Sequence, residues 1–316
     1  MYSKKRIFIS LLFASLLTSC GSSSNISKNI YPFSTYLTIN FYNENNVNID
    51  EITNIIDEYD KLCDPYNAYD GINNLYTINN SNDFIKVDAK LYDILKMSID
   101  AQEKTNGYFN PLIGNLSLTW KEAIENKTLP NDDLISKEIL EINNSSLEFK
   151  DDYMIKINGE ANLDLGGITK GYVLSILKDY LATKNITKYL INGGNSSIIL
   201  GNKNGEEFKV GINNIGAGFK AKETSIGTSS VDEQYFEVNG ITYSHIINPF
   251  TGSAVSKHET VVVINDNATL MDIYSTVFMM LDTEEITKIA NENNFKVIVI
   301  DNKQITYKDS EIELYV

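Results

Sequence analysis

The segment 162–171 holds the residues whose types and spacing point most directly to chemistry. It reads Asn-Leu-Asp-Leu-Gly-Gly-Ile-Thr-Lys-Gly, which places Asp164, Gly166, Gly167 and Lys170 close together at an expected strand-to-helix junction. Glycines let backbone amides approach a ligand, a helix N-terminus attracts anions, and lysine adds a full positive charge. The pattern predicts a phosphate site. An ordinary tight turn before a helix is the alternative, because short glycine-rich matches arise by chance.

A second pair of candidates lies near the start of an expected helix, where Asp272 and Thr276 are four residues apart. Positions i and i+4 share a helix face, so the carboxylate and the hydroxyl can converge on one point. Hard oxygen ligands of this kind suit Mg²⁺. The alternative is structural: Asp272 would cap the helix, and the Thr276 hydroxyl would bond back to the backbone.

The chain has two histidines, His245 and His258, so histidine acid–base chemistry has two candidates. We favour His245, because it ends an expected strand beside the turn Asn-Pro-Phe-Thr-Gly at 248–252, and a rigid turn would hold its side chain in place. A purely structural role is the alternative, since an isolated histidine is more often structural than catalytic.

Aromatic and amide side chains gather in two expected loops. One loop carries Tyr66 and Tyr69, and the other carries Tyr108, Phe109 and Asn110. Such residues can sandwich a flat heterocycle, or they can simply fill the loops that carry them.

The N-terminus has the pattern of an export signal. A basic head at 4–6 precedes an apolar run at 7–17 that is too short to span a membrane, so we expect residues 1–19 to be a signal peptide. Leu-Thr-Ser-Cys at 17–20 resembles a bacterial lipoprotein box, which predicts lipidation of Cys20 and a flexible tether over 20–30; a plain secretory signal is the alternative. We therefore expect a membrane lipoprotein on the extracytoplasmic face, periplasmic or at the outer surface.

Charge and cysteine usage narrow the partners. After removal of residues 1–19 the chain has 24 lysines and 42 acidic residues, a net charge of −18, which disfavours nucleic acid and anionic lipid as partners. Only Cys63 follows Cys20, so no internal disulfide is expected. Arg6 is the only arginine. A phosphate site must therefore use lysine, backbone amides, hydroxyls or a metal ion.

Hydrophobic periodicity predicts an α+β fold with mixed sheets and crossing helices, in two subdomains that meet near 135–160. We expect strands or hairpins over 36–42, 147–157, 188–191, 197–200, 208–212, 224–229, 236–243, 260–264 and 296–300, and helices over 49–62, 90–105, 116–125, 168–182, 270–281 and 284–293.

Taken in order, these motifs resemble the ApbE-type FAD:protein FMN transferases, once described as thiamine-biosynthesis lipoproteins. The resemblance rests on Gly-Tyr-Phe-Asn-Pro at 107–111, Asp-Leu-Gly-Gly-Ile-Thr-Lys-Gly at 164–171, Asn-Gly-Gly-Asn at 192–195, Gly-Thr-Ser at 227–229, His-Ile-Ile-Asn-Pro-Phe-Thr-Gly at 245–252 and Asp-Ile-Tyr-Ser-Thr at 272–276. It covers about 31–300. Asn110 and Asn248 stand where the family often has Asp, and Ser230 stands near a usual Gly.

The resemblance implies a tunnelling-fold-like architecture with FAD bound between two subdomains, and it implies roles for particular residues. The Gly167 carbonyl, Asp272 and Thr276 match ligands of the metal, usually Mg²⁺. His245 matches the proposed catalytic base. The resemblance implies a catalytic role for Asp272 as well. Positions that match FAD-binding residues are Phe33, Thr35, Tyr69, Tyr108, Phe109, Asn110, Asp164, Lys170, His245 and Ile247.

The implied reaction is attack of a Ser or Thr hydroxyl of a target flavoprotein on the FAD pyrophosphate, which leaves FMN in phosphoester linkage and releases AMP. FAD is then the substrate, Mg²⁺ the cofactor, and the partner an exported or membrane-bound redox protein. Two alternatives stay open at this point: a Mg²⁺-dependent FAD pyrophosphatase that yields FMN and AMP, and a non-catalytic flavin-binding lipoprotein.

Overall fold

The computed structural model describes residues 25–315 except 45, 214 and 256. The predicted signal peptide and the lipidation site at Cys20 lie outside the described residues. Residues 26–30 form a strand paired with 37–41, so the expected tether over 20–30 is corrected: its last five residues belong to the folded sheet. None of the helices in the described part of the chain has the length and apolar character that a membrane crossing requires.

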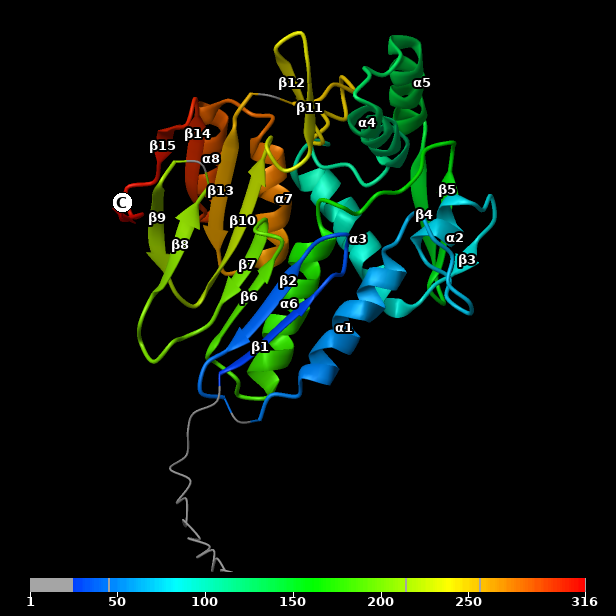
Figure 1. Ribbon diagram of the computed structural model, residues 1–316. Helices are drawn as coiled ribbons and strands as arrows, with labels where there is room; N and C mark the ends of the chain where they lie inside the picture. The colour runs from blue at the N-terminus through cyan, green and yellow to red at the C-terminus, as the bar shows by residue number, and fades with distance from the viewer. Residues whose placement is uncertain (1–24, 45, 214, 256, 316) are drawn as a thin grey trace, which may run out of the picture.

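An eight-stranded sheet forms the centre of the molecule (Figure 1). In spatial order its strands are β1 (Ile26–Ile30), β2 (Leu37–Phe41), β6 (Tyr189–Gly193), β7 (Ser197–Leu200), β10 (Thr224–Ser230), β13 (Thr260–Asn265), β14 (Lys296–Asp301) and β15 (Gln304–Lys308). Each neighbouring pair among these strands is antiparallel.

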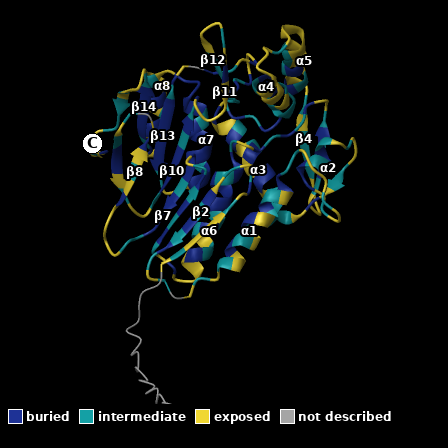
Figure 2. Ribbon diagram, viewed as in Figure 1, coloured by how far each residue is buried: buried dark blue, intermediate teal, exposed yellow. Residues whose placement is uncertain are grey.

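Both faces of the sheet are covered, and β13 shows how the sequence encodes this. Its residues are apolar without alternation: Val261 and Val263 join the core beneath the helices, whereas Val262 and Ile264 join a second apolar cluster on the opposite face. A strand buried on both faces reads as a continuous apolar run. Figure 2 shows β10 and β13 among the most buried elements.

Helices α6 (Thr169–Thr183) and α7 (Ala268–Phe278) pack on one face of this sheet and on each other, and α1 (Ile49–Leu62) packs against α6. The opposite face carries a small sheet of β8 (Phe208–Ile212), β9 (Ala217–Ala221) and β16 (Leu314–Tyr315). Helix α8 (Thr283–Asn293) packs beside β14.

The remaining elements lie to the other side of α1 and α6 and toward the upper end of the molecule in Figure 1. They are α2 (Leu75–Asn79), β3 (Ile85–Lys86), α3 (Ala89–Lys104), α4 (Gly114–Asn126), α5 (Asp132–Asn143), β4 (Ser146–Lys150), β5 (Met154–Asn158) and the hairpin β11 (Tyr235–Val238) and β12 (Ile241–Ser244). One continuous hydrophobic cluster joins residues of this part to residues of the central sheet.

The expected α+β class is confirmed. The six expected helices all occur, and 49–62 matches α1 at both ends. Helices α2 and α5 and strands β1, β3, β9, β15 and β16 were not predicted. The strand pairings among the described residues are antiparallel throughout, which is simpler than the mixed sheets expected. The proposed seam near 135–160 stays a prediction.

Two glycines allow the central layers to approach closely. A Cβ at Gly227 in β10 would lie 2.1 Å from the Met271 carbonyl oxygen in α7. A Cβ at Gly171 in α6 would lie 2.4 Å from the Ala268 carbonyl oxygen and 2.5 Å from Cβ of Asp272. In both places the obstacle is backbone or a short side chain near its root, so only glycine permits this spacing.

We expect Gly227→Ala to lower the free energy of unfolding by about 1–3 kcal/mol, because the added methyl group must push α7 away from β10. Gly211→Ala in β8 is the matched control, since nothing lies within 4 Å of its added Cβ, and it should change stability by less than about 0.5 kcal/mol. Urea unfolding followed by circular dichroism compares them. Equal effects of the two substitutions would contradict the close-packing explanation.

Candidate active site

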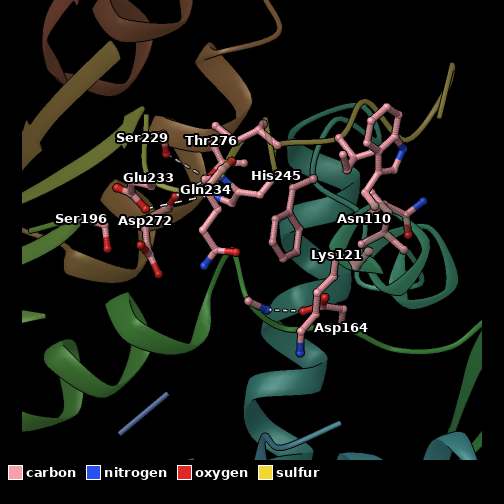
Figure 3. Close-up of a pocket in the computed structure, with 18 of the residues that line it drawn as sticks. Asn110, Lys121, Asp164, Ser196, Ser229, Glu233, Gln234, His245, Asp272 and Thr276 are labelled. Atoms are coloured by element: carbon pink, nitrogen blue, oxygen red, sulfur yellow. Dashed lines mark hydrogen bonds and ion pairs between the residues drawn. The ribbon is translucent and has the colours of Figure 1, made fainter. Parts of the chain in front are cut away.

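A cavity of about 250 Å³ has β10 and the helix α7 on one side and the loops around α4 on the other (Figure 3). Its polar wall comes from α6, α7, β10 and the turn that follows β10. Its other wall comes from the loop before α4, from α4 itself and from the segment before α6. The cavity is lined by Tyr66, Tyr108, Phe109, Asn110, Ile113, Ser117, Trp120, Lys121, Ile124, Asp164, Gly166, Gly167, Lys170, Ser196, Thr228, Ser229, Glu233, Gln234, His245, Ile246, Ile247, Asp272, Thr276 and Met280.

The Asp272 carboxylate is buried in the polar wall, with 6% of the residue exposed. Its Oδ1 accepts a hydrogen bond from Ser197 Oγ at 2.6 Å, and its Oδ2 accepts one from the Gly171 amide at 2.9 Å. The α7 N-cap is Asn267, whose side chain accepts from the Leu270 amide, so the alternative in which Asp272 caps the helix is wrong. Two donors instead orient a buried carboxylate toward the cavity.

Hydroxyl groups surround the next turn of α7. Thr276 Oγ1 lies 3.2 Å from Ser229 Oγ, and Ser229 Oγ lies 3.0 Å from Ser275 Oγ. Thr276 Oγ1 also donates to the Asp272 carbonyl at 3.3 Å, so the back-bonding alternative does describe this hydroxyl. That bond leaves lone pairs on the Thr276 oxygen, which lines the cavity together with Asp272.

Backbone geometry at the start of α6 bears on a metal site. The Gly171 amide lies in the first turn of α6, where amides have no partner within the helix, and it donates to Asp272. The next amide, that of Tyr172, donates to the Ile168 carbonyl. Within the described residues no backbone amide donates to the Gly167 carbonyl, and Gly167 lines the cavity. A carboxylate, a hydroxyl and a spare carbonyl oxygen form a donor set that fits a hard cation.

The described residues contain no cluster of three or more His, Cys, Asp and Glu side chains that could hold a metal ion. The donor set at Asp272 is of a different kind, because only one of its three oxygens belongs to a carboxylate. One carboxylate neutralises only part of the charge of a divalent cation. A cation bound here would therefore retain net positive charge that could attract an anionic ligand.

His245 follows β12 directly and faces the cavity. Its backbone amide donates to the Gln234 carbonyl at 3.0 Å, and its Nδ1 lies 3.3 Å from the same oxygen. A carbonyl oxygen can only accept, so this contact assigns the proton of the neutral imidazole to Nδ1 and leaves the lone pair on Nε2. Nε2 lies 4.0 Å from Oε2 of Glu233.

Burial lowers the pKa of His245; the Gln234 carbonyl opposes this, and the Lys170 ammonium adds to it. Burial also raises the pKa of Glu233, against the Lys170 charge and together with the Asp272 charge. Lys170 makes no ion pair within 4 Å with any carboxylate of the described residues, although it lines the cavity. This cation is therefore available to an anionic ligand.

The opposite wall is aromatic and held by backbone contacts. Asp164 is fixed at both ends, because its amide donates to the Pro111 carbonyl and its Oδ1 accepts from the Gly166 amide at 2.6 Å. The Phe109 ring packs over Gly167, 3.4 Å from where a Cβ would be.

Two further contacts tie α4 and the loop before it to the turn after His245. Trp120 Nε1 donates to the Gly252 carbonyl at 2.7 Å, and the Tyr108 ring meets the Phe250 ring edge to face at 5.1 Å. These contacts close the cavity across two segments that are far apart in the sequence.

Most of the predicted site residues meet at this cavity. It brings together Tyr108, Phe109, Asn110, Asp164, Gly167, Lys170, His245, Ile247, Asp272 and Thr276. Their binding and catalytic roles remain predictions, which the arrangement of side chains alone does not test.

Three predicted FAD-lining residues lie outside the cavity lining. The Phe33 amide donates to Asp60 at 2.7 Å, and the Tyr69 hydroxyl donates to Asp64 at 2.8 Å. Thr35 fills the space beside Gly194, where its Oγ1 is 2.3 Å from an added Cβ.

Sequence reasoning named Tyr66 only as one of the loop aromatics, and it missed Glu233 and Gln234 altogether. Tyr66, rather than Tyr69, faces the cavity, where Lys121 Nζ lies 4.0 Å above its ring. Glu233 and Gln234 gave no motif of their own. Their signal was the Asn-Gly hairpin turn at 239–240, because pairing outward from that turn sets Gln234 opposite His245.

Comparison with known proteins gives a consistent picture. Residues 33–299 match the family model of the ApbE family. A Treponema pallidum protein named FAD:protein FMN transferase is 25% identical over 232 residues, which cover 66% of this chain and 64% of that protein. A Vibrio cholerae protein of the same name is 23% identical over 261 residues, which cover 79% of this chain and 78% of that protein.

Solved structures agree with the fold. The ApbE protein of Thermotoga maritima superimposes with a TM-score of 0.78 at 21% identity, covering 92% of this chain and 96% of that one. The flavin transferase ApbE of Vibrio cholerae gives a TM-score of 0.74 at 20% identity, covering 92% and 98%.

Coverage of the curated relatives is uneven. The match spans less than two thirds of the first two, with 64% of the Treponema pallidum protein and 43% of a Rhodobacter capsulatus protein of the same name, to which this chain is 24% identical over 223 residues.

We expect Lys170→Met to raise the pKa of His245, because the substitution removes a positive charge that disfavours the imidazolium. Lys121→Met is the matched control: it removes a lysine from the same cavity, but from the aromatic wall, where the Lys121 ammonium lies over the Tyr66 ring. NMR titration of the imidazole protons measures both, with His245→Asn used for assignment. An equal response of His245 to the two substitutions would show that Lys170 has no special influence.

Proposed function

We propose the following function for this chain, which belongs to the ApbE family: it transfers FMN from FAD to a Ser or Thr hydroxyl of a target protein through a phosphoester bond and releases AMP. The relatives named FAD:protein FMN transferase support this activity. The observation that carries the proposal is the meeting of a buried carboxylate, an unpaired ammonium and an imidazole with a free Nε2 lone pair around one cavity.

Mg²⁺ fits the donor set of the polar wall. The residues that would hold it are Asp272, Thr276 and Gly167, the last through its carbonyl oxygen. When bound, a divalent cation would neutralise pyrophosphate oxygens and stabilise the charge that develops as the bond to AMP breaks. The chain is acidic and its only arginine is Arg6, so it must bind a dianionic pyrophosphate without an arginine in the site. A bound cation would supply the positive charge.

Lys170 supplies the second positive charge. It lies in the first turn of α6, and its ammonium acts on both His245 and Glu233 across the cavity. A lysine at this place would bind a pyrophosphate oxygen as a point charge.

His245 is suited to act as the general base. With the Nδ1 proton held toward the Gln234 carbonyl, Nε2 can accept the proton of the incoming hydroxyl. The lowered pKa keeps the imidazole neutral, and therefore able to accept a proton, at pH values below its usual range. The aromatic wall with Tyr66, Tyr108 and Phe109 offers flat surfaces for the ring systems of FAD.

We further propose that the protein acts outside the cytoplasm as a lipoprotein anchored through Cys20, on an exported or membrane-bound redox protein. The basic and apolar N-terminal pattern and the residues Leu-Thr-Ser before Cys20 support this location. The target would present its Ser or Thr on a segment flexible enough to reach the cavity.

Asp272→Asn should abolish Mg²⁺-dependent flavin transfer and leave the fold intact. The amide can keep both hydrogen bonds, with its oxygen accepting from the Gly171 amide and its NH₂ donating to Ser197 Oγ, but it loses the charge that a cation needs. AMP release from FAD and circular dichroism are measured together. Full activity of a folded Asp272→Asn protein would refute the assigned metal site.

The acceptor reaction itself is tested on membranes of the source organism incubated with the protein, FAD and Mg²⁺. We expect in-gel flavin fluorescence in a denatured acceptor and a mass increase of one FMN on a Ser or Thr. Release of AMP and FMN without any labelled protein would indicate an FAD pyrophosphatase instead. No AMP release under any of these conditions would indicate a flavin-binding protein without catalysis.

The pH dependence follows from His245. We expect transfer to fall as the pH drops through the pKa of His245, and burial places this fall below pH 6.5, the ordinary value for histidine. His245→Ala should retain FAD binding and lose transfer. If transfer by the His245→Ala protein fell at the same acidic pH as transfer by the unmodified protein, another residue would be the base.

A further inference from the structure

Glu233 occupies a junction that no sequence motif indicated. It lies in the turn between β10 and β11 and lines the candidate active site. Together with Thr228 it also lines a second cavity of about 330 Å³, which lies over the opposite face of the sheet beneath β8. Glu233 is the only charged residue among the described residues that these two cavities share.

The β11–β12 hairpin and the turn before it place Glu233 beside His245. Tyr235 pairs with Ser244, and the ladder continues one step, because the His245 amide donates to the Gln234 carbonyl. Glu233 is the residue before Gln234 and lies outside β11, in the turn that follows β10. A regular strand would point it to the opposite face from His245, but here the turn directs its Oε2 to 4.0 Å from Nε2 of His245. Figure 3 shows Glu233 and His245 turned toward each other on the same side of the cavity.

The charges around this pair are few. Among the described residues, Glu233 provides the only carboxylate within 4.0 Å of the imidazole. Lys170 of α6 acts on both members of the pair, and Asp272 of α7 acts on Glu233. The pKa of Glu233 is raised and that of His245 is lowered, so the proton affinities of the two groups are shifted toward each other.

We propose that Glu233 is the positioning residue of the base, a carboxylate that stabilises the imidazolium of His245 and then receives its proton. The inference rests on the proposed function, since it assigns His245 a proton to pass on. Glu233 acts through His245 and does not contact the reacting atoms.

The proton balance is as follows. The Ser or Thr O–H bond breaks and its proton goes to Nε2 of His245, while the hydroxyl oxygen forms a bond to the FMN phosphorus. The bond from that phosphorus to the oxygen of AMP breaks, and AMP leaves with the electron pair. Oε2 of Glu233, which lies 4.0 Å from Nε2, then closes to hydrogen-bonding distance and takes the proton from Nε2–H, which restores the neutral base. The Glu233 side chain is 36% exposed, so solvent can take the proton from it.

The test compares Glu233→Gln with Glu237→Gln, which removes the same charge from an exposed position in β11 outside both cavities. NMR titration gives the pKa of His245, and AMP release from FAD and Mg²⁺ gives kcat and KM. We expect Glu233→Gln to lower the pKa of His245 and to reduce kcat about tenfold or more, with KM for FAD within about twofold. Glu237→Gln should leave all three quantities unchanged.

A Glu233→Gln protein with an unchanged His245 pKa would overturn the proposal, and so would an unchanged kcat. Glu233→Asp adds a second check, because it keeps the charge on a shorter side chain and should restore the His245 pKa more fully than kcat. The NMR measurement needs no substrate. Absence of AMP release from the unmodified protein would therefore refute the proposed function, while the coupling of Glu233 to His245 would still be decided by titration.

Discussion

The candidate site depends on one buried carboxylate that is held by donors from two other elements. Asp272 receives hydrogen bonds from Ser197 in β7 and from the first turn of α6 at Gly171. A buried carboxylate without such partners would be costly, and these two bonds let it stay ordered in the wall of a cavity. The same bond gives a first-turn amide of α6 its partner, and the nearby Gly167 carbonyl accepts from no backbone amide of the described residues.

That arrangement requires three layers to approach more closely than ordinary side chains allow. Gly171 brings α6 against α7, and Gly227 brings β10 against α7. The Ser229 and Thr276 hydroxyls come within 3.2 Å as a consequence. The glycine-rich sequence therefore acts here mainly through helix packing, in addition to the close backbone approach to a ligand that such sequences usually indicate.

The sequence predicted those parts of the fold and site that are encoded locally. The apolar spacing of 49–62 gave α1, and the Asn-Gly turn at 239–240 gave the β11–β12 hairpin, at whose end His245 lies. Ten of the thirteen predicted lining residues of the cavity occur together, although they come from four segments that are far apart in the sequence. Their grouping into one site was implied by the resemblance to the ApbE family, and local pattern alone would not have given it.

The elements and site residues that the sequence did not predict depend on long-range pairing or have a mixed hydrophobic pattern. Residues 26–30 look like a polar tether, and become a strand only because β2 offers an edge. Helix α5 was missed because Leu134 and Leu140 are exposed and blur its apolar stripe. Glu233 was missed because it lies outside the hairpin ladder, and its distance to His245 depends on the course of the turn between β10 and β11.

We propose that Asp272, Thr276 and the Gly167 carbonyl bind the cation to which the FAD pyrophosphate binds. The most direct test is anomalous diffraction from crystals of the protein grown with FAD and Mn²⁺, which substitutes for Mg²⁺ and gives a measurable anomalous signal. We predict an anomalous peak among these three oxygens with pyrophosphate oxygens completing its coordination. FAD bound in the cavity with manganese at another place, or with no manganese peak, would contradict the account.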